Sequence, residues 1–286
     1  MLIIRVFFVK RNLCYNKIMQ ILFLVSLFIL GSCFGSFLCC EARRLHIKTK
    51  GKSKKLGSRS VCLSCGYQLK WYDNLPIISW VLLRGKCRKC HKKIGIAEFL
   101  SELGTGLAFL ALGTTMDIMS ATPMTWTIFI ITSVFTLSLG FLAIYDGIYG
   151  ELPMRGLIVS IILGIVIIIL KSCMSISSVG FSVNLTLDPI VSVAILGGIY
   201  FILYFVSKGK WVGDGDWILG TAIGLALASP WLALIALFIA NVLACLVMLP
   251  VVKKSKNKHI YFGPFMVVAY VITFTFADFF YYAIGM

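Results

Sequence analysis

Long apolar stretches, separated by short polar segments, run through the chain from residue 21 almost to its end. A helix needs about 20 mainly apolar residues to cross the hydrocarbon core of a bilayer. The pattern therefore predicts about eight transmembrane helices, of which the sixth is short and is joined to the seventh through Ser229-Pro230. The expected segments are Ile21–Cys40, Phe99–Met116, Met124–Tyr145, Leu157–Leu170, Leu187–Val206, Trp217–Ser229, Trp231–Val252 and Phe262–Ile284.

The composition supports the same class. Hydrophobic residues make up 59% of the 286 residues and charged residues 13%, whereas soluble domains have about 45–50% apolar and about 25% charged residues. We therefore predict an all-α polytopic membrane protein, with the lipid bilayer as its environment.

Basic residues are concentrated between the apolar segments. Of the 27 lysines and arginines, 15 lie in the stretch 41–97, and four more lie in Lys253–Lys258. An excess of Lys and Arg marks the cytoplasmic loops of membrane proteins, so we place 41–97 in the cytoplasm. Counting crossings then puts 146–156, 207–216 and 253–261 on the same side. The charge is explained by topology, and we expect no nucleic-acid partner.

The N-terminal tail, residues 1–20, does not fit this orientation. It would lie outside although it carries Arg5, Lys10, Arg11 and Lys17. A true start at Met19 would remove the conflict. We accordingly divide the chain into this tail, a first transmembrane helix (21–40), a cytoplasmic loop (41–97) and a membrane-embedded domain (98–286).

The loop 41–97 contains two cysteine pairs, Cys62-Leu-Ser-Cys65 and Cys87-Arg-Lys-Cys90. Four thiolates at this spacing can complete a tetrahedral shell around Zn²⁺, and the neighbouring basic side chains favour thiolates over thiols. Two disulfides or free thiols are the alternatives, but a reducing compartment disfavours disulfides. We expect a closed, structural zinc site, because a polar unit this small needs more than a hydrophobic core to fold. His91 is expected to be a bystander.

Acidic residues number only 11, and three of them lie at the same expected membrane level. Asp146 ends the third apolar segment, while Asp214 and Asp216 open the sixth. Ionisable groups at such positions suggest function, although Asp214 could simply cap its helix. Asp146 and Asp216 are each next to glycine, and two carboxylates that share a proton can activate water and protonate a leaving amine. Of the two, Asp216 begins a helix and would be the initial base, with Asp146 the initial acid.

Other polar or small residues are less specific. Glu98 and Glu102 enter the second span on one helical face, where they could pair with loop cations or hold substrate. Gly220 and Gly224 are expected to allow close helix packing.

Taken in order, these residues resemble the type IV prepilin peptidase family, which are bacterial membrane aspartic proteases of the GxGD class. The matching blocks are Gly35-Ser36-Phe37-Leu38 with Arg43, the two cysteine pairs with the segment between them, Asp146 with Leu152-Pro153, Gly213-Asp214-Gly215-Asp216, and Phe262-Gly263-Pro264-Phe265. The resemblance implies that Asp146 and Asp216 are the catalytic aspartates and that Cys62, Cys65, Cys87 and Cys90 bind zinc.

The resemblance also implies a substrate and a location. Such enzymes remove the short basic leader of prepilins and pseudopilins at the cytoplasmic face of the bacterial plasma membrane. Larger members of the family also N-methylate the new N-terminus with S-adenosylmethionine, and we expect the same here. A cation transporter that uses intramembrane acids is the alternative, but it assigns no role to the cysteine-rich loop.

Overall fold

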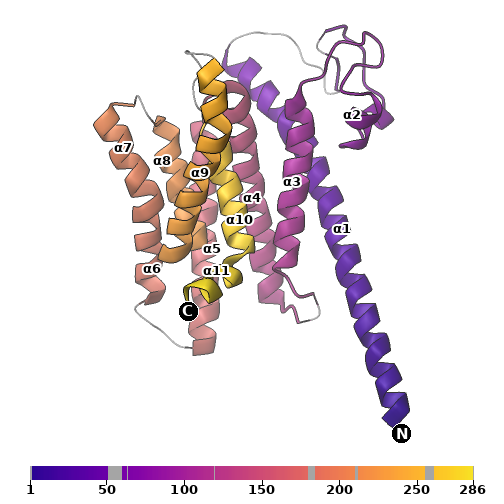
Figure 1. The fold of residues 1–286 in the computed structure, drawn as a ribbon, viewed down its shortest axis with the longest axis vertical. Coiled ribbons are helices and arrows are strands. Elements are labelled where there is room, and N and C mark those ends of the chain that lie inside the picture. Colours follow the sequence, from indigo (N-terminus) through magenta and orange to yellow (C-terminus); the bar gives the residue numbers. More distant parts are fainter. Residues whose placement is uncertain are drawn as a thin grey trace.

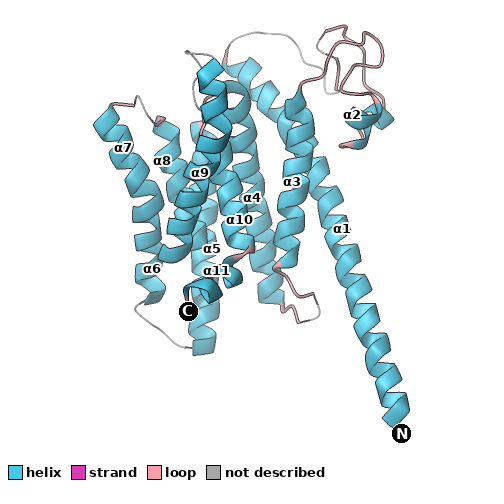
Figure 2. Cartoon of the chain, in the orientation of Figure 1, coloured by secondary structure: helices cyan, strands magenta, loops and turns pink. Residues whose placement is uncertain are grey.

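The chain is described here from a computed structural model, which covers residues 2–50, 60–62, 64–118, 120–179, 184–209, 212–254 and 261–285. Within these residues the structure is helical, and its only extended pairings are two isolated β-bridges in the cysteine-rich loop. Figure 2 shows helices joined by loops, with no strand drawn. The predicted all-α fold is confirmed.

The helices lie side by side as a bundle, with α1 projecting from it at its N-terminal end (Figure 1). Their bounds are α1 (Leu2–Thr49), a 3₁₀ turn η1 (Trp71–Asn74), α2 (Ile78–Leu82), α3 (Ile96–Thr114), α4 (Pro123–Tyr149), α5 (Met154–Val179), α6 (Asn184–Val193), a π-helical segment η2 (Ala194–Gly198), α7 (Ile199–Ser207), α8 (Asp214–Leu227), α9 (Pro230–Lys254), α10 (Gly263–Thr275) and α11 (Ala277–Ile284).

Every expected apolar segment is helical, but the helices differ in length. In the described part of the chain, six helices are long and apolar enough to cross a membrane, and a seventh span is possible if α10 and α11, which meet at 71°, count as one. Helix α8 has only 14 residues, which is about 21 Å at 1.5 Å per residue. It is therefore too short to cross a hydrocarbon core of about 30 Å.

One end of the bundle carries the cysteine-rich loop together with the connections α4–α5, α7–α8 and α9–α10, whereas the chain termini lie toward the other end (Figure 1). We call the end with the cysteine-rich loop the basic end, because the connections gathered there carry most of the Lys and Arg. This grouping agrees with the count of crossings expected from the sequence. Met1, Lys210, Lys256 and Lys258 lie outside the described residues.

Helix α1 differs from the sequence expectation in its length. It runs unbroken from Leu2 to Thr49 and so includes both the expected tail and the start of the expected loop. It packs closely against α3 through small residues. A Cβ added to Gly31 would lie 2.6 Å from the backbone oxygen of Thr105, and one added to Gly35 would overlap the Thr105 hydroxyl. Small residues at a helix–helix contact let the backbones approach in this way.

The buried core lies among α4, α5, α8, α9 and α10. Leu139, Leu142, Leu157, Leu219 and Tyr270 are fully buried there. Helix α8 is enclosed by these neighbours and approaches the α6–η2 segment closely, because a Cβ on Gly220 would lie 2.7 Å from the Leu196 carbonyl and one on Gly224 would lie 2.9 Å from the Ser192 carbonyl. The close packing expected at these two glycines is confirmed.

The C-terminal end of α8 lies inside the bundle, so its last carbonyls need partners from other helices. Ser192 donates a hydrogen bond to the Gly224 carbonyl at 2.8 Å, and Lys171 on α5 donates to the Ala226 carbonyl at 3.1 Å. The Lys171 ammonium also lies 5.4 Å from the centre of the Phe274 ring. A cation at a helix C-terminus also interacts favourably with the helix dipole.

We predict that Lys171→Met lowers the stability of the folded chain by about 1–3 kcal/mol, because it leaves the Ala226 carbonyl without its donor. The apparent Tm in detergent micelles measures the effect. Lys48→Met, which removes an exposed cation from α1, is the matched control and should leave the Tm unchanged. Equal Tm values for the two variants would contradict this role of Lys171.

Candidate active site and metal centre

Asp146 lies in the last turn of α4, at the basic end of the bundle. The helix ends at Gly150, which adopts the left-handed conformation (φ 69°) and donates its N–H to the Asp146 carbonyl at 2.7 Å. The side chain is 6% exposed, and its Oδ2 accepts a hydrogen bond from the backbone N–H of Gly263 at 2.9 Å. The first residue of α10 thus holds a carboxylate of α4.

Asp216 lies in the first turn of α8. Its side chain is 7% exposed, and its Oδ2 accepts a hydrogen bond from the backbone N–H of Gly213 at 2.9 Å. Asp214, two residues earlier, is exposed. The structure therefore separates the two acids of the Gly213–Asp216 motif, since only Asp216 faces the interior of the bundle.

Two glycines, Gly263 and Gly215, allow the helix ends that carry these aspartates to approach neighbouring elements closely. A Cβ on Gly263 would lie 2.8 Å from Asp146 Oδ2, and one on Gly215 would lie 2.7 Å from the Leu152 side chain in the α4–α5 connection. Gly147 packs against Pro264 at ordinary contact distance. The charge of Asp216 acts on Asp146, so α4, α8 and α10 bring two buried carboxylates to the same end of the bundle.

Gly263 belongs to this site as well, although the positions of the acidic residues in the sequence do not point to it. Its signal was present in the Phe262-Gly263-Pro264-Phe265 block, where glycine and proline open an apolar helix. What the sequence could not show is that the free N–H at the start of α10 is directed at Asp146 from 117 residues away. The same N–H changes the electrostatics, because both aspartates now lie next to the positive end of a helix.

The four predicted zinc ligands come together in the cysteine-rich loop. The sulfur atoms of Cys62, Cys65, Cys87 and Cys90 all lie within 4.8 Å of one another, and they form a group that could hold a metal ion. Four thiols at this separation suit a closed tetrahedral site. The predicted gathering of the four cysteines is confirmed.

Two similar turns build this cluster. In the first, Gly66 follows Cys65 and has a positive φ of 70°; in the second, His91 follows Cys90 and has a φ of 56°. Isolated bridges, Val61 with Gln68 and Lys86 with Lys93, close the two turns. His91 therefore serves the turn, as Gly66 does, and does not belong to the sulfur cluster, as expected.

Electrostatics around the cluster favour a thiolate at Cys62 and a thiol at Cys65. A backbone hydrogen bond from Tyr67 lowers the pKa of Cys65, but hydrogen bonds with the other three thiols outweigh it and raise that pKa to about 11. Burial raises the pKa of the Cys62 thiol, but hydrogen bonds from the backbone of Cys65 and Ser64 and from neighbouring thiols outweigh it and lower that pKa from 9.0 to about 7. Between the turns, the buried Asp73 accepts a hydrogen bond from Arg88 Nε at 2.7 Å and one from the Lys70 N–H at 3.2 Å. This contact ties η1 to the second turn.

The structure is that of a polytopic helical membrane protein with two buried aspartates at the basic end of the bundle and a cluster of four cysteines that could hold a metal ion. Comparison with known proteins supports the resemblance seen in the sequence. Residues 29–116 match the Bacterial Peptidase A24 N-terminal domain. The resemblance to the type IV prepilin peptidase family is confirmed by this match and by the relatives below, whose longer alignments cover 73% and 77% of the chain.

Named relatives show both strong local and weaker long matches. The prepilin leader peptidase/N-methyltransferase of Myxococcus xanthus is 43% identical over 90 residues, which is 32% of this chain and 26% of that protein. The protein of the same name from Neisseria gonorrhoeae is 29% identical over 234 residues, or 77% of this chain and 71% of the relative. The protein of the same name from Pseudomonas putida is 26% identical over 226 residues, which is 73% of this chain and 69% of the relative. No solved structure matches the chain.

We predict that Cys87→Ser abolishes stoichiometric metal binding by the purified full-length chain, because three thiolates and a hydroxyl no longer complete the tetrahedral shell. Metal content per chain, measured by elemental mass spectrometry after dialysis, should fall to background. Cys245→Ser, at an exposed cysteine outside the cluster, should retain the metal. Metal retained in Cys87→Ser at the level of the control would show that the cluster is not the metal site.

Proposed function

We propose that this chain is a membrane aspartic endopeptidase of the bacterial plasma membrane, which removes the basic leader of type IV prepilins or pseudopilins at the cytoplasmic face. The observation that carries the proposal is the pair of buried carboxylates, Asp146 and Asp216, held at one end of the bundle by separate helices. The names of the relatives support the choice of substrate.

The arrangement of the pair suits hydrolysis of a peptide bond. Each aspartate is anchored through one oxygen, Oδ2, to a backbone N–H, so the other oxygen of each is the one available to a shared water. The ionised carboxylate removes a proton from that water as it attacks the scissile carbonyl, and the protonated one donates its proton to the carbonyl oxygen. Proton transfer to the leaving amine then completes cleavage.

We propose Asp216 as the initial base, as its position at a helix start suggests. The N–H of Gly263 supplies a similar positive helix end to Asp146, so the difference between the two acids is smaller than the sequence alone implied. Two carboxyls that share a proton would titrate together, so in this proposal the roles belong to the pair as much as to either residue.

Membrane depth supplies much of the substrate specificity in this proposal. The aspartates lie at the basic end of the bundle. A substrate with an apolar helix and a basic leader would place the junction of its leader and its helix at this level. A peptide that is not embedded in the bilayer would not present its bond at this level. The basic end is accordingly proposed to be cytoplasmic.

Two further parts of the proposal concern groups other than the aspartates. We propose that the four cysteines hold Zn²⁺ as a structural ion, because four sulfur ligands leave no open position for a substrate. We also propose that the chain N-methylates the newly exposed N-terminus with S-adenosylmethionine, as the relatives' names suggest. The cation-transporter alternative finds no support in these comparisons.

We predict that Asp146→Asn and Asp216→Asn each reduce leader removal by at least about a hundredfold, because an amide can neither accept nor supply the transferred proton. The assay is co-expression with a prepilin, with precursor and mature forms separated by electrophoresis. Asp214→Asn, at the exposed neighbour, is the matched control and should process the prepilin at the wild-type rate.

The proposal fails if either substitution of the pair leaves processing near normal. It also fails if the purified wild type does not process a prepilin in vesicles but instead moves cations across them, as the transporter alternative requires.

A further inference from the structure

Helix α2, in the cysteine-rich loop, has two different faces. Ser79 and Trp80 line a cavity between α1, the loop and α3. Ile78, Val81 and Leu82 are instead 55–77% exposed, and their spacing of i, i+3 and i+4 puts them on one face of the helix. The chain therefore turns an apolar face away from the protein, in a loop that the sequence predicts to lie in the cytoplasm.

Contacts with α3 fix the height of α2 along the bundle. The backbone N–H of Ile77 donates to Glu102 Oε2 at 2.7 Å, and the centres of the Trp80 and Phe99 rings are 4.7 Å apart. Glu102 is six residues beyond Ile96, where α3 begins, which is about 9 Å at 1.5 Å per residue. Figure 1 shows α2 beside the upper turns of α3, with the rest of the loop extending beyond the end of that helix. Helix α2 therefore lies level with the first two turns of α3, which is long and apolar enough to cross the membrane.

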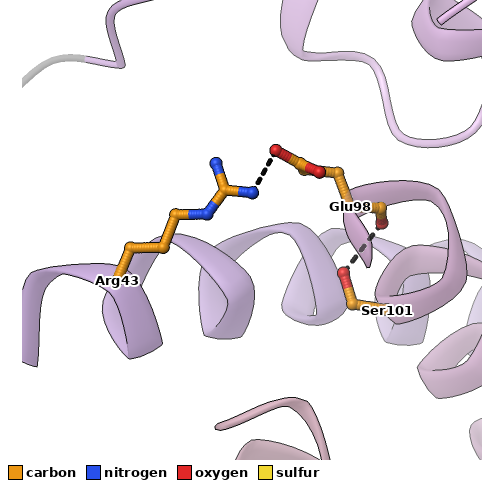
Figure 3. A network of polar contacts seen from close by, with 3 residues as sticks. All are labelled: Arg43, Glu98 and Ser101. Atoms are coloured by element: carbon orange, nitrogen blue, oxygen red, sulfur yellow. Dashed lines mark hydrogen bonds and ion pairs between the residues drawn. The ribbon is translucent and has the colours of Figure 1, made fainter. Parts of the chain in front are cut away.

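The start of α3 is itself held in place and is apolar on its surface. Arg43 of α1 forms an ion pair with Glu98, and the Ser101 hydroxyl donates to the Glu98 backbone carbonyl at 2.8 Å (Figure 3). At the same level α3 exposes Ile96 (62%) and Leu100 (56%). The apolar face of α2 thus lies at the height of apolar surface that a membrane-spanning helix presents to lipid.

The chain reaches this position through a tight turn at Ile77. This residue has φ 63° and ψ −52°, and the N–H of Ile78 donates to the Pro76 carbonyl at 2.6 Å. A turn of this kind is rare, and a positive φ is costly for a β-branched residue. The buried Glu102 carboxylate accepts the Ile77 N–H and so stabilises the turn. The placement of α2 against α3 is therefore built into the fold.

Basic residues flank α2 in the chain. Lys70 precedes it, Arg84 and Lys86 follow it, and all three are exposed. Asp73 is the only acidic residue between positions 42 and 97. It is buried and accepts a hydrogen bond from Arg88. The exposed charge of the loop is therefore entirely positive.

We propose that α2 inserts its apolar face into the interface of the bilayer leaflet at the basic end, and that Lys70, Arg84 and Lys86 bind the phosphates of anionic lipid headgroups. Apolar side chains next to basic ones are typical of segments that lie in a membrane interface, and lysines and arginines beside a membrane are attracted to anionic lipids. Lipid is the occupant that the geometry favours, because α2 lies at the depth of that leaflet. The inference goes beyond the peptidase reaction and does not depend on it.

Insertion would also bring the cysteine cluster to the membrane surface. Gly85 donates its N–H to the Trp80 carbonyl at 2.9 Å and accepts a hydrogen bond from the Ile94 N–H at 2.7 Å. These bonds tie α2 to the segments on either side of the Cys87–Cys90 turn. The inserted helix and the second cysteine turn therefore form one unit.

The test places a photoreactive side chain on the apolar face. p-Benzoyl-L-phenylalanine replaces Leu82, or Ile78 in a second variant, in the full-length chain reconstituted into vesicles of phosphatidylcholine and phosphatidylglycerol. After irradiation, mass spectrometry of the labelled peptide identifies what was captured. We expect phospholipid adducts at both positions, with a yield comparable to that at Leu100 of α3. Gln68, an exposed polar position after the first cysteine pair, is the matched control and should give no lipid adduct.

A second arm tests the headgroup. In the chain labelled at Leu82, Arg84→Gln combined with Lys86→Gln should lower the ratio of phosphatidylglycerol to phosphatidylcholine adducts by at least about fivefold, because each basic residue near an anionic surface adds to the attraction. Lys17→Gln removes an exposed cation near the other end of α1 and should leave the ratio unchanged. An unchanged ratio in the Arg84 and Lys86 variant would contradict the headgroup contacts.

Three outcomes would overturn the insertion. They are equal lipid labelling at Leu82 and Gln68, the absence of lipid adducts at both Leu82 and Ile78, and the capture of a co-reconstituted prepilin at Leu82 in place of lipid. The last result would make the apolar face a substrate-docking surface. None of these measurements uses leader removal, so the peptidase proposal stands or falls separately.

Discussion

The hydrogen bonding of the buried C-terminal end of one short helix is the constraint on which the catalytic arrangement depends. Helix α8 is too short to cross the bilayer, and its C-terminal end cannot rely on water as the end of a membrane-spanning helix does. Lys171 and Ser192 supply donors to its last carbonyls, while Asp216 accepts the Gly213 N–H at its start. The position of α8 along the bundle, and with it the depth of Asp216, follows from these contacts.

Glycines make possible the other close contacts around α8 and Asp146. Gly215, Gly220 and Gly224 allow neighbouring elements to contact the backbone of α8, and Gly263 leaves room for the Asp146 carboxylate. Each of these contacts lies at a distance that a Cβ would violate. The two aspartates are therefore positioned by backbone packing, which is stiffer than positioning by long side chains. Such stiffness keeps paired carboxylates close despite their repulsion.

The same kind of packing organises the N-terminal part of the chain. Small residues bring α1 and α3 into close contact. At the basic end, Arg43 on α1 and Glu98 on α3 form an ion pair. Residues of the cysteine-rich loop and Tyr149 at the end of α4 line a cavity next to this ion pair.

The sequence by itself determined the class of fold, the end of the bundle at which the polar connections gather, the four-cysteine cluster and the two candidate aspartates. These features depend on local composition and spacing, so apolar length, Lys and Arg counts and the Cys-x-x-Cys pairs were sufficient to predict them. Only the tertiary structure decided that α8 falls short of a full span, that α10 directs a backbone N–H at Asp146, and that Glu98 pairs with Arg43 while Glu102 binds the Ile77 N–H. Each of these facts depends on which helices pack together and at what relative height, and this is set by contacts between residues far apart in the chain.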